Sequence, residues 1–473
     1  MLTREEFQLI YEQGFEAVWA VIEALQHSHR VLETRVKELE DRLGKDSHNS
    51  SKPPSSDGYK KKPVSLRPVT GRKTGGQQGH KGETLLFSQN PDVIVHHTPT
   101  ECTHCHHALA ETPGTQAERR QVLDLPPLAL VTTEHRAMHK TCPHCGTHNV
   151  GAFPEEVAPR VGYGTNLKAL ALYLKNFQLL PAARIITLFS DLFGTSFCEG
   201  TLFPLQQRAS EQLEPFLERV RSALIASPVV NCDETGSRVE GNLHWLHSAS
   251  TEEFTLYGCH RKRGKEGIDH LGVLPSYEGV AVHDGWASYE GYGCSHALCN
   301  AHHLRELVSL CEQGQVWASE MSALLVEMKR AVEDAKVAGL SRLPQVEEEA
   351  LFSRYAVLLT KGFTAHPAAL PSGKRGKAKQ SVGYNLLRRL SVGQDAVLRF
   401  VVDFSVPFDN NLAERDIRMM KLQQKVSGGF RTSAGVTAFC RIRSYISTLR
   451  KQGYAVLPAL QQLLQGKPII PEI

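Results

Sequence analysis

Two cysteine pairs constrain the fold of this chain more than any other feature of its sequence. Cys102 and Cys105 form one CxxC motif, and Cys142 and Cys145 form a second one beyond a long spacer, residues 106–141. Four thiolates in two such pairs can surround a structural Zn²⁺ tetrahedrally. We therefore predict a zinc-binding module over residues 93–155, to which the metal contributes folding energy. A redox role is the weaker alternative, because a single pair suffices for thiol exchange.

The spacer between the pairs contains VLDLPPLALVTTEHRAM. We expect this run to fold back as a β-hairpin and so to bring the two CxxC motifs together.

An apolar heptad runs through residues 1–45. Its two columns are Phe15, Ile22, His29, Val36 and Leu43, and Val18, Leu25, Leu32 and Leu39. About four heptads of this kind predict a coiled-coil helix that pairs two copies of the chain. An amphipathic helix packed on its own domain is the alternative.

Residues 46–92 are predicted to form a linker, because their Ser, Pro, Gly and Lys composition cannot bury a core. From Gly58 to Gly82 the chain has seven Lys or Arg and no Asp or Glu. We expect this arm to bind phosphate backbones through charge alone. A solvated linker is the alternative. The expected contacts are Lys60, Lys61, Lys62, Arg72 and Lys73.

The chain then changes between helical and strand patterns. Apolar residues at helical spacing predict a helical domain over residues 156–226, of a kind that often recognises DNA. From residue 227, the runs VVNCDET, NLHWLHSAST and EEFTLYGCH predict a meander of three strands, and EGVAVHDG predicts a fourth. Residues 313–402 are mostly helical in pattern and include a basic loop with Lys374 and Arg375.

Three acidic residues stand at the ends of these predicted elements. Asp233 follows the first strand, Asp284 follows the fourth, and Glu414 lies on a helix that Asp409 or Asn410 can cap. Carboxylates that converge on one cleft can hold Mg²⁺ for in-line phosphoryl transfer. Spacing alone does not select these three among 50 acidic residues.

Two groups of side chains near these acids each have two interpretations. Trp286 and Tyr289 can stack on an unpaired base or pack in the core. Cys299 and His302 can bind a second metal, but packing at a buried strand end beside the site is the favoured interpretation.

Basic residues concentrate after the third acid. Residues 415–451 contain nine Lys or Arg and a single acid, Asp416. Such a surface favours DNA, because neutralised phosphates release counterions. A solvated helical face is the alternative. The expected contacts on this segment are Arg418, Lys421, Lys425 and Arg431.

The order of these motifs resembles that of transposases of the insertion-sequence-66 family, which are of the DDE type. The resemblance covers nearly the whole chain: the N-terminal zipper, NSSKPPSSD, GRKTGGQQGHKGETL, the CxxC pairs, CDET, HDGWASYEGY, CNAHHLREL, DNNLAERDIRMMK and SGGFRTSAG. It implies a catalytic triad of Asp233, Asp284 and Glu414 with Mg²⁺ or Mn²⁺, and structural Zn²⁺ on the four cysteines. It also implies a ribonuclease-H-like core and small accessory proteins encoded by the same element.

We therefore expect an α+β multidomain protein, with a ribonuclease-H-like catalytic core that contains a helical insertion, a zinc-ribbon-like module and an N-terminal coiled coil. The expected segments are a zipper helix at 1–45, a linker at 46–92, the zinc module at 93–155, a helical DNA-binding domain at 156–226, the first part of the core at 227–312, the insertion at 313–402, the helix of the third carboxylate at 403–431 and a helical end at 432–473.

The expected function is DNA transposition: binding of the element's ends, metal-dependent end cleavage and strand transfer. The expected partner is double-stranded DNA, bound by a homodimer or a higher oligomer. Neither a membrane span nor a signal-peptide pattern is present in the sequence, so we expect a protein of the bacterial cytoplasm that associates with the nucleoid. The alternatives are a catalytically inactive, zinc-containing DNA-binding regulator and a structural adaptor assembled through the zipper.

Overall fold

The computed structural model describes residues 3–43, 85–115, 118–126, 128–154, 157, 160–195, 197–369, 378 and 380–472. The chain divides into two units: Met1–Val64, Glu156–Leu188 and Ser196–Ile473 form one, and Ser65–Glu155 with Phe189–Thr195 form the other. Most of the predicted linker, and with it Lys60, Lys61, Lys62, Arg72 and Lys73, lies outside the described residues, as do Lys374 and Arg375.

A five-stranded mixed sheet forms the centre of the larger unit. Its strands are β3 (Val229–Val239), β4 (Asn242–Ser250), β5 (Thr255–His260), β6 (Val280–His283) and β7 (Ser295–Leu298), in the order β5-β4-β3-β6-β7. The meander β3-β4-β5 is antiparallel, whereas β6 and β7 run parallel to β3. The four predicted strands are confirmed. The fifth, β7, was not predicted.

Burial explains why β3 and β4 occupy the middle of the sheet. The last five residues of β4, from Leu246 to Ser250, are all buried, so both faces of this strand are covered. In β3, Val230, Asn231 and Cys232 are buried in succession. Strands that are covered on both faces lose the alternation of apolar and polar residues that marks a half-exposed strand.

Along the chain, helices precede the sheet, lie between its strands and follow it. Before it come α3 (Thr165–Leu172), η3 (Tyr173–Phe177), α4 (Ala182–Phe193), α5 (Glu199–Glu211) and α6 (Glu214–Ala226). Between its strands lie α7 (Lys265–Leu271), η4 (Leu274–Ser276) and η5 (Tyr289–Gly291). After it come α8 (Asn300–Glu312), α9 (Val316–Val337), α10 (Gln345–Ala365), α11 (Val382–Val392), α12 (Gln394–Val402), α13 (Asn411–Ser427), α14 (Ser433–Lys451) and α15 (Val456–Leu464).

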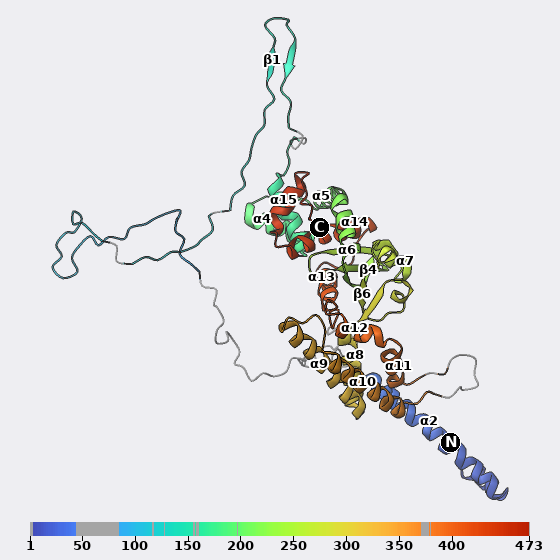
Figure 1. Cartoon of the computed structure of the whole chain (residues 1–473). Coiled ribbons are helices and arrows are strands. Elements are labelled where there is room, and N and C mark those ends of the chain that lie inside the picture. The colour runs from blue at the N-terminus through green and yellow to red at the C-terminus, as the bar shows by residue number, and fades with distance from the viewer. Residues whose placement is uncertain are drawn as a thin grey trace. The chain divides into compact units, whose positions relative to one another are not determined.

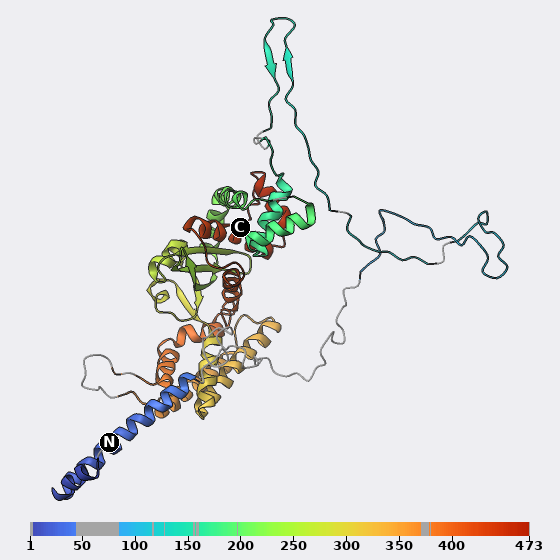
Figure 2. The same cartoon turned by 180° about the vertical axis from the view of Figure 1, so that it is seen from behind.

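Helices from distant parts of the chain complete the core around the sheet. Helices α13 and α14 pack on β3, β4 and β5, as the two opposite views in Figures 1 and 2 show. Tyr445 of α14 packs edge-on against Phe216 of α6, with ring centroids 4.9 Å apart. Helices α8 to α12 form a second apolar cluster that includes Val282 of β6 and Ala297 of β7. Helix α14, near the end of the chain, thus helps to form the core around β5.

The N-terminal segment forms α1 (Arg4–Glu12) and α2 (Phe15–Leu43). The break between them is at Gly14, whose φ of 98° lies in the left-handed region. Leu25 and Leu32 of the predicted seam are 63% and 61% exposed, so α2 presents apolar side chains to solvent. No helix in the described ranges is both long and apolar enough to cross a membrane.

In the smaller unit, a short antiparallel hairpin pairs β1 (His139–Thr141) with β2 (His148–Val150). It surrounds the second CxxC motif. The prediction of a hairpin within VLDLPPLALVTTEHRAM was wrong, because the described residues of that run form no strand. Pro126 gives a physical reason: it has no N–H group for a ladder and disfavours a regular strand.

Candidate active site

Asp233 and Asp284 come from neighbouring strands of the sheet, β3 and β6. The parallel pairing of β3 with β6 ends at Asn231 and Val282. Asp233 lies two residues further, inside β3, so the expectation that it follows the first strand was wrong, because β3 stays paired with β4 as far as Val239. Asp284 directly follows the last residue of β6, as expected. The backbone N–H of Trp286 donates a hydrogen bond of 2.9 Å to Oδ1 of Asp284 and so fixes that carboxylate.

The start of α13 is attached to β3 through Asn410. Its side-chain amide donates to the carbonyl of Cys232 at 2.8 Å, and its Oδ1 accepts from the amide of Asn231 at 2.9 Å. These bonds fix the first turn of α13, which carries Glu414, next to the residues that precede Asp233. Asn410 is buried. Of the two predicted caps, Asn410 occupies the N-cap position without a side-chain capping bond, and Oδ1 of Asp409 accepts a hydrogen bond from the N–H of Asn411 at 3.1 Å.

The acids influence one another electrostatically. The pKa of Asp233 lies well above its ordinary value, mainly because burial disfavours the charged form. The negative charge of Glu234 raises it further, and those of Asp284 and Glu414 add to the effect. A bound cation would favour the ionised carboxylate, so the site combines several acids with a physical need for positive charge.

The three carboxylates share this neighbourhood without forming a single tight cluster. Among the described residues, they do not form a group in which all ligand oxygens lie within 4.8 Å of one another. One ion therefore could not contact all three in this arrangement. Two ions about 3.5–4 Å apart, each about 2.1 Å from its oxygen ligands, span a wider set of carboxylates. A pair of divalent ions on these three carboxylates stays a prediction.

Sequence analysis missed a buried network next to Asp233. Glu234 accepts a hydrogen bond of 2.6 Å from the Tyr289 hydroxyl and an ion pair of 2.7 Å from Arg263. The guanidinium of Arg263 lies 4.8 Å from the ring centroid of Trp245 and 4.2 Å from that of Trp286. Tyr289 is buried, so of its two interpretations core packing is correct. The adjacency of Glu234 to Asp233 was the only available signal.

Three further side chains gather around Glu414. Nδ1 of His302 lies 3.8 Å from Oε1 of Glu414, and the guanidinium of Arg305 lies 3.9 Å from Oε2. Cys299 belongs to the same group. Cys299 is the residue before α8, and His302 and Arg305 lie in the first and second turns of that helix. The motif CNAHHLREL is therefore part of the site's wall.

The cationic segment after Glu414 is only partly available to a ligand. Arg443 is buried and donates to the carbonyl of Asn176 at 3.2 Å, which corrects its inclusion in a DNA-binding face. Arg441 pairs with Glu214 at 2.7 Å. Lys451 pairs with Asp416 at 2.8 Å.

The four predicted contacts on this segment remain at the surface. Arg418 and Lys425 on α13 are exposed. Lys421 donates to the carbonyl of Gly236 at 2.7 Å, and Arg431 pairs with Glu199 at 3.5 Å while staying 89% exposed. These four positions form the candidate DNA contacts in the described part of the larger unit.

The two CxxC motifs fold into similar turns. The N–H of His106 donates to the carbonyl of Cys102 at 3.0 Å, and the N–H of Gly146 donates to that of Cys142 at 2.9 Å. Both His106 and Gly146 have positive φ, 57° and 74°. Local backbone donors lower the pKa of Cys102, and hydrogen bonds from Thr147 lower that of Cys145. Low thiol pKa values suit metal ligands.

The turns bring the cysteines together in pairs rather than as a set of four. No three of these thiols lie within 4.8 Å of one another, although all four are described. A zinc site on Cys102, Cys105, Cys142 and Cys145 therefore stays a prediction.

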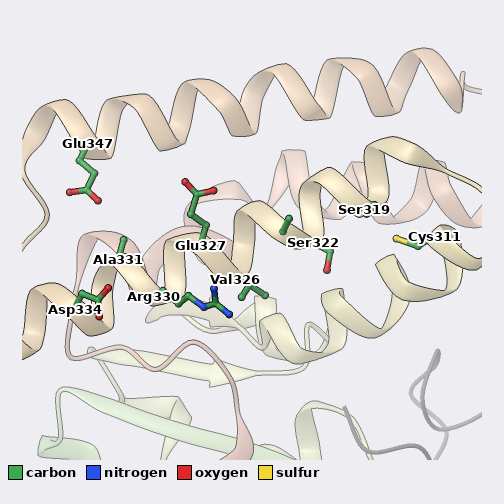
Figure 3. Close-up of a pocket in the computed structure, with 10 residues that line it drawn as sticks. Cys311, Ser319, Ser322, Val326, Glu327, Arg330, Ala331, Asp334 and Glu347 are labelled. Atoms are coloured by element: carbon green, nitrogen blue, oxygen red, sulfur yellow. The ribbon is translucent and has the colours of Figure 1, made fainter. Parts of the chain in front are cut away.

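A groove lies elsewhere in the larger unit. It has a volume of about 770 Å³ and is lined by residues of α8, α9 and α10 (Figure 3). Glu327, Asp334 and Glu347 give it an acidic lining, and Glu327 is bound to Arg354 at 2.6 Å. It contains none of the three predicted acids, and its acidic lining repels phosphate. We do not assign the active site to it.

Comparison with known families agrees with the resemblance noted in the sequence. Residues 160–438 match the transposase IS66 family, and residues 99–146 match the zinc-finger binding domain of transposase IS66. Residues 6–85 match a family of unknown function. No individual curated protein matches the chain. The first match covers more than half of the 473 residues and contains Asp233, Asp284 and Glu414. The chain therefore belongs to the IS66 family of transposases.

Proposed function

We propose that this transposase binds the ends of its element and cleaves them with two Mg²⁺ or Mn²⁺ ions held by Asp233, Asp284 and Glu414. The observation that carries the proposal is that the three acids come from adjoining parts of the fold: Asp233 from β3, Asp284 from the residue after β6, and Glu414 from the first turn of α13. The negative charges of Asp284 and Glu414 both raise the pKa of Asp233, which supports their proximity. The hydrogen bonds of Asn410 attach the helix of the third acid to β3.

We infer a ribonuclease-H-like core from the same topology. An antiparallel meander followed by two parallel strands on the β3 side supports this assignment, with the first acid on the first strand and the second after the fourth. Helices α9 to α12 between β7 and α13 then constitute the proposed insertion, residues 313–402.

The proposed chemistry consists of two in-line phosphoryl transfers at one site. When bound, the divalent ions activate the attacking oxygen and stabilise the leaving oxygen. Water is the first nucleophile and frees a 3′-OH at the element end, and that hydroxyl then attacks target DNA. The three carboxylates supply the negative charge that would hold the ions. Arg263 and Tyr289 keep Glu234 in a fixed position beside Asp233.

DNA binding is proposed to depend on the exposed cations. Arg418, Lys421, Lys425 and Arg431 lie on or just after the helix that carries Glu414, so a phosphate backbone bound there would pass close to the acids. The arm at residues 46–92 and the loop with Lys374 and Arg375 would add contacts of the same kind. We propose double-stranded DNA as the partner, a homodimer as the minimal assembly, and small accessory proteins of the element as further partners.

A cleavage assay on DNA that carries an element end tests the proposal. The variants Asp233→Asn, Asp284→Asn and Glu414→Gln should each lose about 4 kcal/mol of transition-state stabilisation, or about 10³-fold in rate. Each should still bind the DNA in a mobility-shift assay. Glu290→Gln, which changes an exposed acid in the same region, should cleave normally. Full cleavage by any of the three variants would remove that residue from the proposed site.

A further inference from the structure

Three side chains with different ligand atoms meet beside the proposed magnesium site. The thiol of Cys299, one ring nitrogen of His302 and one carboxylate oxygen of Glu414 all lie within 4.8 Å of one another. The distance from Nδ1 of His302 to Oε1 of Glu414 is 3.8 Å. Among the described residues this is the only such group of His, Cys, Asp or Glu.

The convergence follows from how α8 and α13 begin. The backbone N–H of Asn410 donates to Sγ of Cys299 at 3.2 Å, and the N–H of Asn300 donates to the carbonyl of Phe408 at 3.1 Å. These bonds join the first residues of the two helices. His302 lies three residues after Cys299, so both face the first turn of α13. The set is held by backbone contacts, not only by flexible side chains.

Two of the three ligand atoms are buried without a hydrogen bond. Nδ1 of His302 and Oε1 of Glu414 have no hydrogen-bonding partner in the part of the chain that the structure describes. A buried polar atom left unpaired costs about 1–3 kcal/mol. Arg305 approaches the other oxygen of Glu414, at 3.9 Å, and does not satisfy either atom. A small cation between them would satisfy both.

We propose that Cys299, His302 and Glu414 bind a borderline-soft divalent cation of the zinc class, and that this ion withdraws Glu414 from the magnesium pair. Thiolate and imidazole ligands select such ions, whereas Mg²⁺ takes oxygen ligands. Three protein ligands leave a fourth position for water or a phosphate oxygen. The inhibition rests on the proposed function of Glu414, but the binding does not.

The distances suit this ion after a small contraction. Bonds of about 2.0–2.3 Å in a tetrahedral site place ligand atoms about 3.3–3.7 Å apart. The separation of 3.8 Å between His302 and Glu414, and separations from Cys299 of no more than 4.8 Å, thus require movements of about 1 Å or less, within the reach of side-chain rotation. The N–H of Asn410 that donates to Cys299 would stabilise a thiolate once the ion binds.

Titration of the full-length chain with Co²⁺, after one equivalent of Zn²⁺ has been supplied for the four-cysteine module, tests the binding. We expect one further equivalent of Co²⁺ to bind, with a thiolate-to-cobalt charge-transfer band in the near ultraviolet. Cys299→Ser should lose both the further equivalent of Co²⁺ and the charge-transfer band. His302→Gln, which changes a less buried ligand, should weaken the added binding at least tenfold. Cys311→Ser, a cysteine on the same helix and outside the group, should behave as wild type. An absent band in the wild type, or an unchanged one in Cys299→Ser, would overturn the proposal.

Cleavage of element-end DNA at saturating Mg²⁺ tests the inhibition separately. Added Zn²⁺ should inhibit the wild type, and half-inhibition of Cys299→Ser, relative to its own zinc-free rate, should require at least tenfold more Zn²⁺. If wild type and Cys299→Ser were equally sensitive to Zn²⁺, the inhibitory role of the ion would be overturned. The cobalt titration would still decide whether the three side chains bind the ion. Complete absence of cleavage with Mg²⁺ in the wild type would count against the proposed function and leave the cobalt result standing.

Discussion

Asp233 is the residue on which the proposed active site depends most. Its carboxylate is partly withdrawn from water and has three acidic neighbours, which together raise its pKa. An acid whose pKa is raised on folding contributes its stabilisation fully below the ordinary value of 3.8 and loses it as the pH rises through the raised value. At neutral pH the charged residue therefore destabilises the chain until a cation binds.

We predict that Mn²⁺ stabilises the wild-type chain at neutral pH and fails to stabilise Asp233→Asn. A ligand at 100 times its Kd contributes about 2.7 kcal/mol, which corresponds to a rise in Tm of about 5 °C. Without metal, Asp233→Asn should be more stable than wild type at neutral pH, and the difference should shrink as the pH falls. Thermal unfolding measured by circular dichroism checks both effects. Glu290→Gln is the control and should respond to Mn²⁺ as wild type does.

Asp233 and Asp284 could be singled out from the sequence because each follows a recognisable apolar run. The position of Asp284 after a strand was predictable, whereas Asp233 lies inside β3, because pairing with β4 extends that strand to Val239. Asn410, Glu234 and Arg263 act through contacts across 29 to 179 residues of sequence, and no local pattern reports such contacts. The buried state of Arg443 was hidden for the same reason, because its partner Asn176 lies 267 residues earlier.

At the scale of elements, the site is built from parts of several helices and strands. The middle of β3, the residue after β6 and the starts of α8 and α13 contribute to it. Short strands were the hardest to predict. The run SHAL of β7 has four residues and only two apolar side chains, so its strand state comes from parallel pairing with β6. Longer runs such as β4 carry enough pattern to be recognised alone.

We predict that zinc holds the two cysteine turns together. Removing it with a chelator should make residues 93–155 sensitive to limited proteolysis, because a module with almost every described side chain exposed has little core of its own. Cys105→Ser should lose one equivalent of zinc, measured by elemental analysis, and show the same sensitivity. Cys198→Ser, an exposed cysteine outside the module, is the matched control. Protease resistance that persists after complete zinc removal would contradict the zinc assignment.

At the scale of the whole molecule, the exposed apolar side of α2 calls for a partner surface. Phe15, Leu25 and Leu32 are more than half exposed on a helix of 29 residues. Leu25 and Leu32 continue a seven-residue spacing from Val18, and Phe15 begins the second column of the seam, a pattern that fits pairing with a second copy. A dimer formed here would deliver two catalytic units to the two ends of one element.

We predict that Leu25→Asp weakens self-association of the full-length chain by at least about tenfold, because pairing would bury an unpaired charge. His27→Asp places the same charge on the side of the helix away from the seam and should leave association unchanged. Sedimentation equilibrium of both variants measures the difference. A wild-type chain that sediments as a monomer at all concentrations would rule out the zipper.

The most direct test of the central claim is the position of the catalytic ions. Crystals of the chain with element-end DNA and Mn²⁺ should show two anomalous scattering peaks about 3.5–4 Å apart, within bonding distance of Asp233, Asp284 and Glu414. Peaks that lie away from these carboxylates, or a DNA complex in which no Mn²⁺ binds between them, would contradict the account.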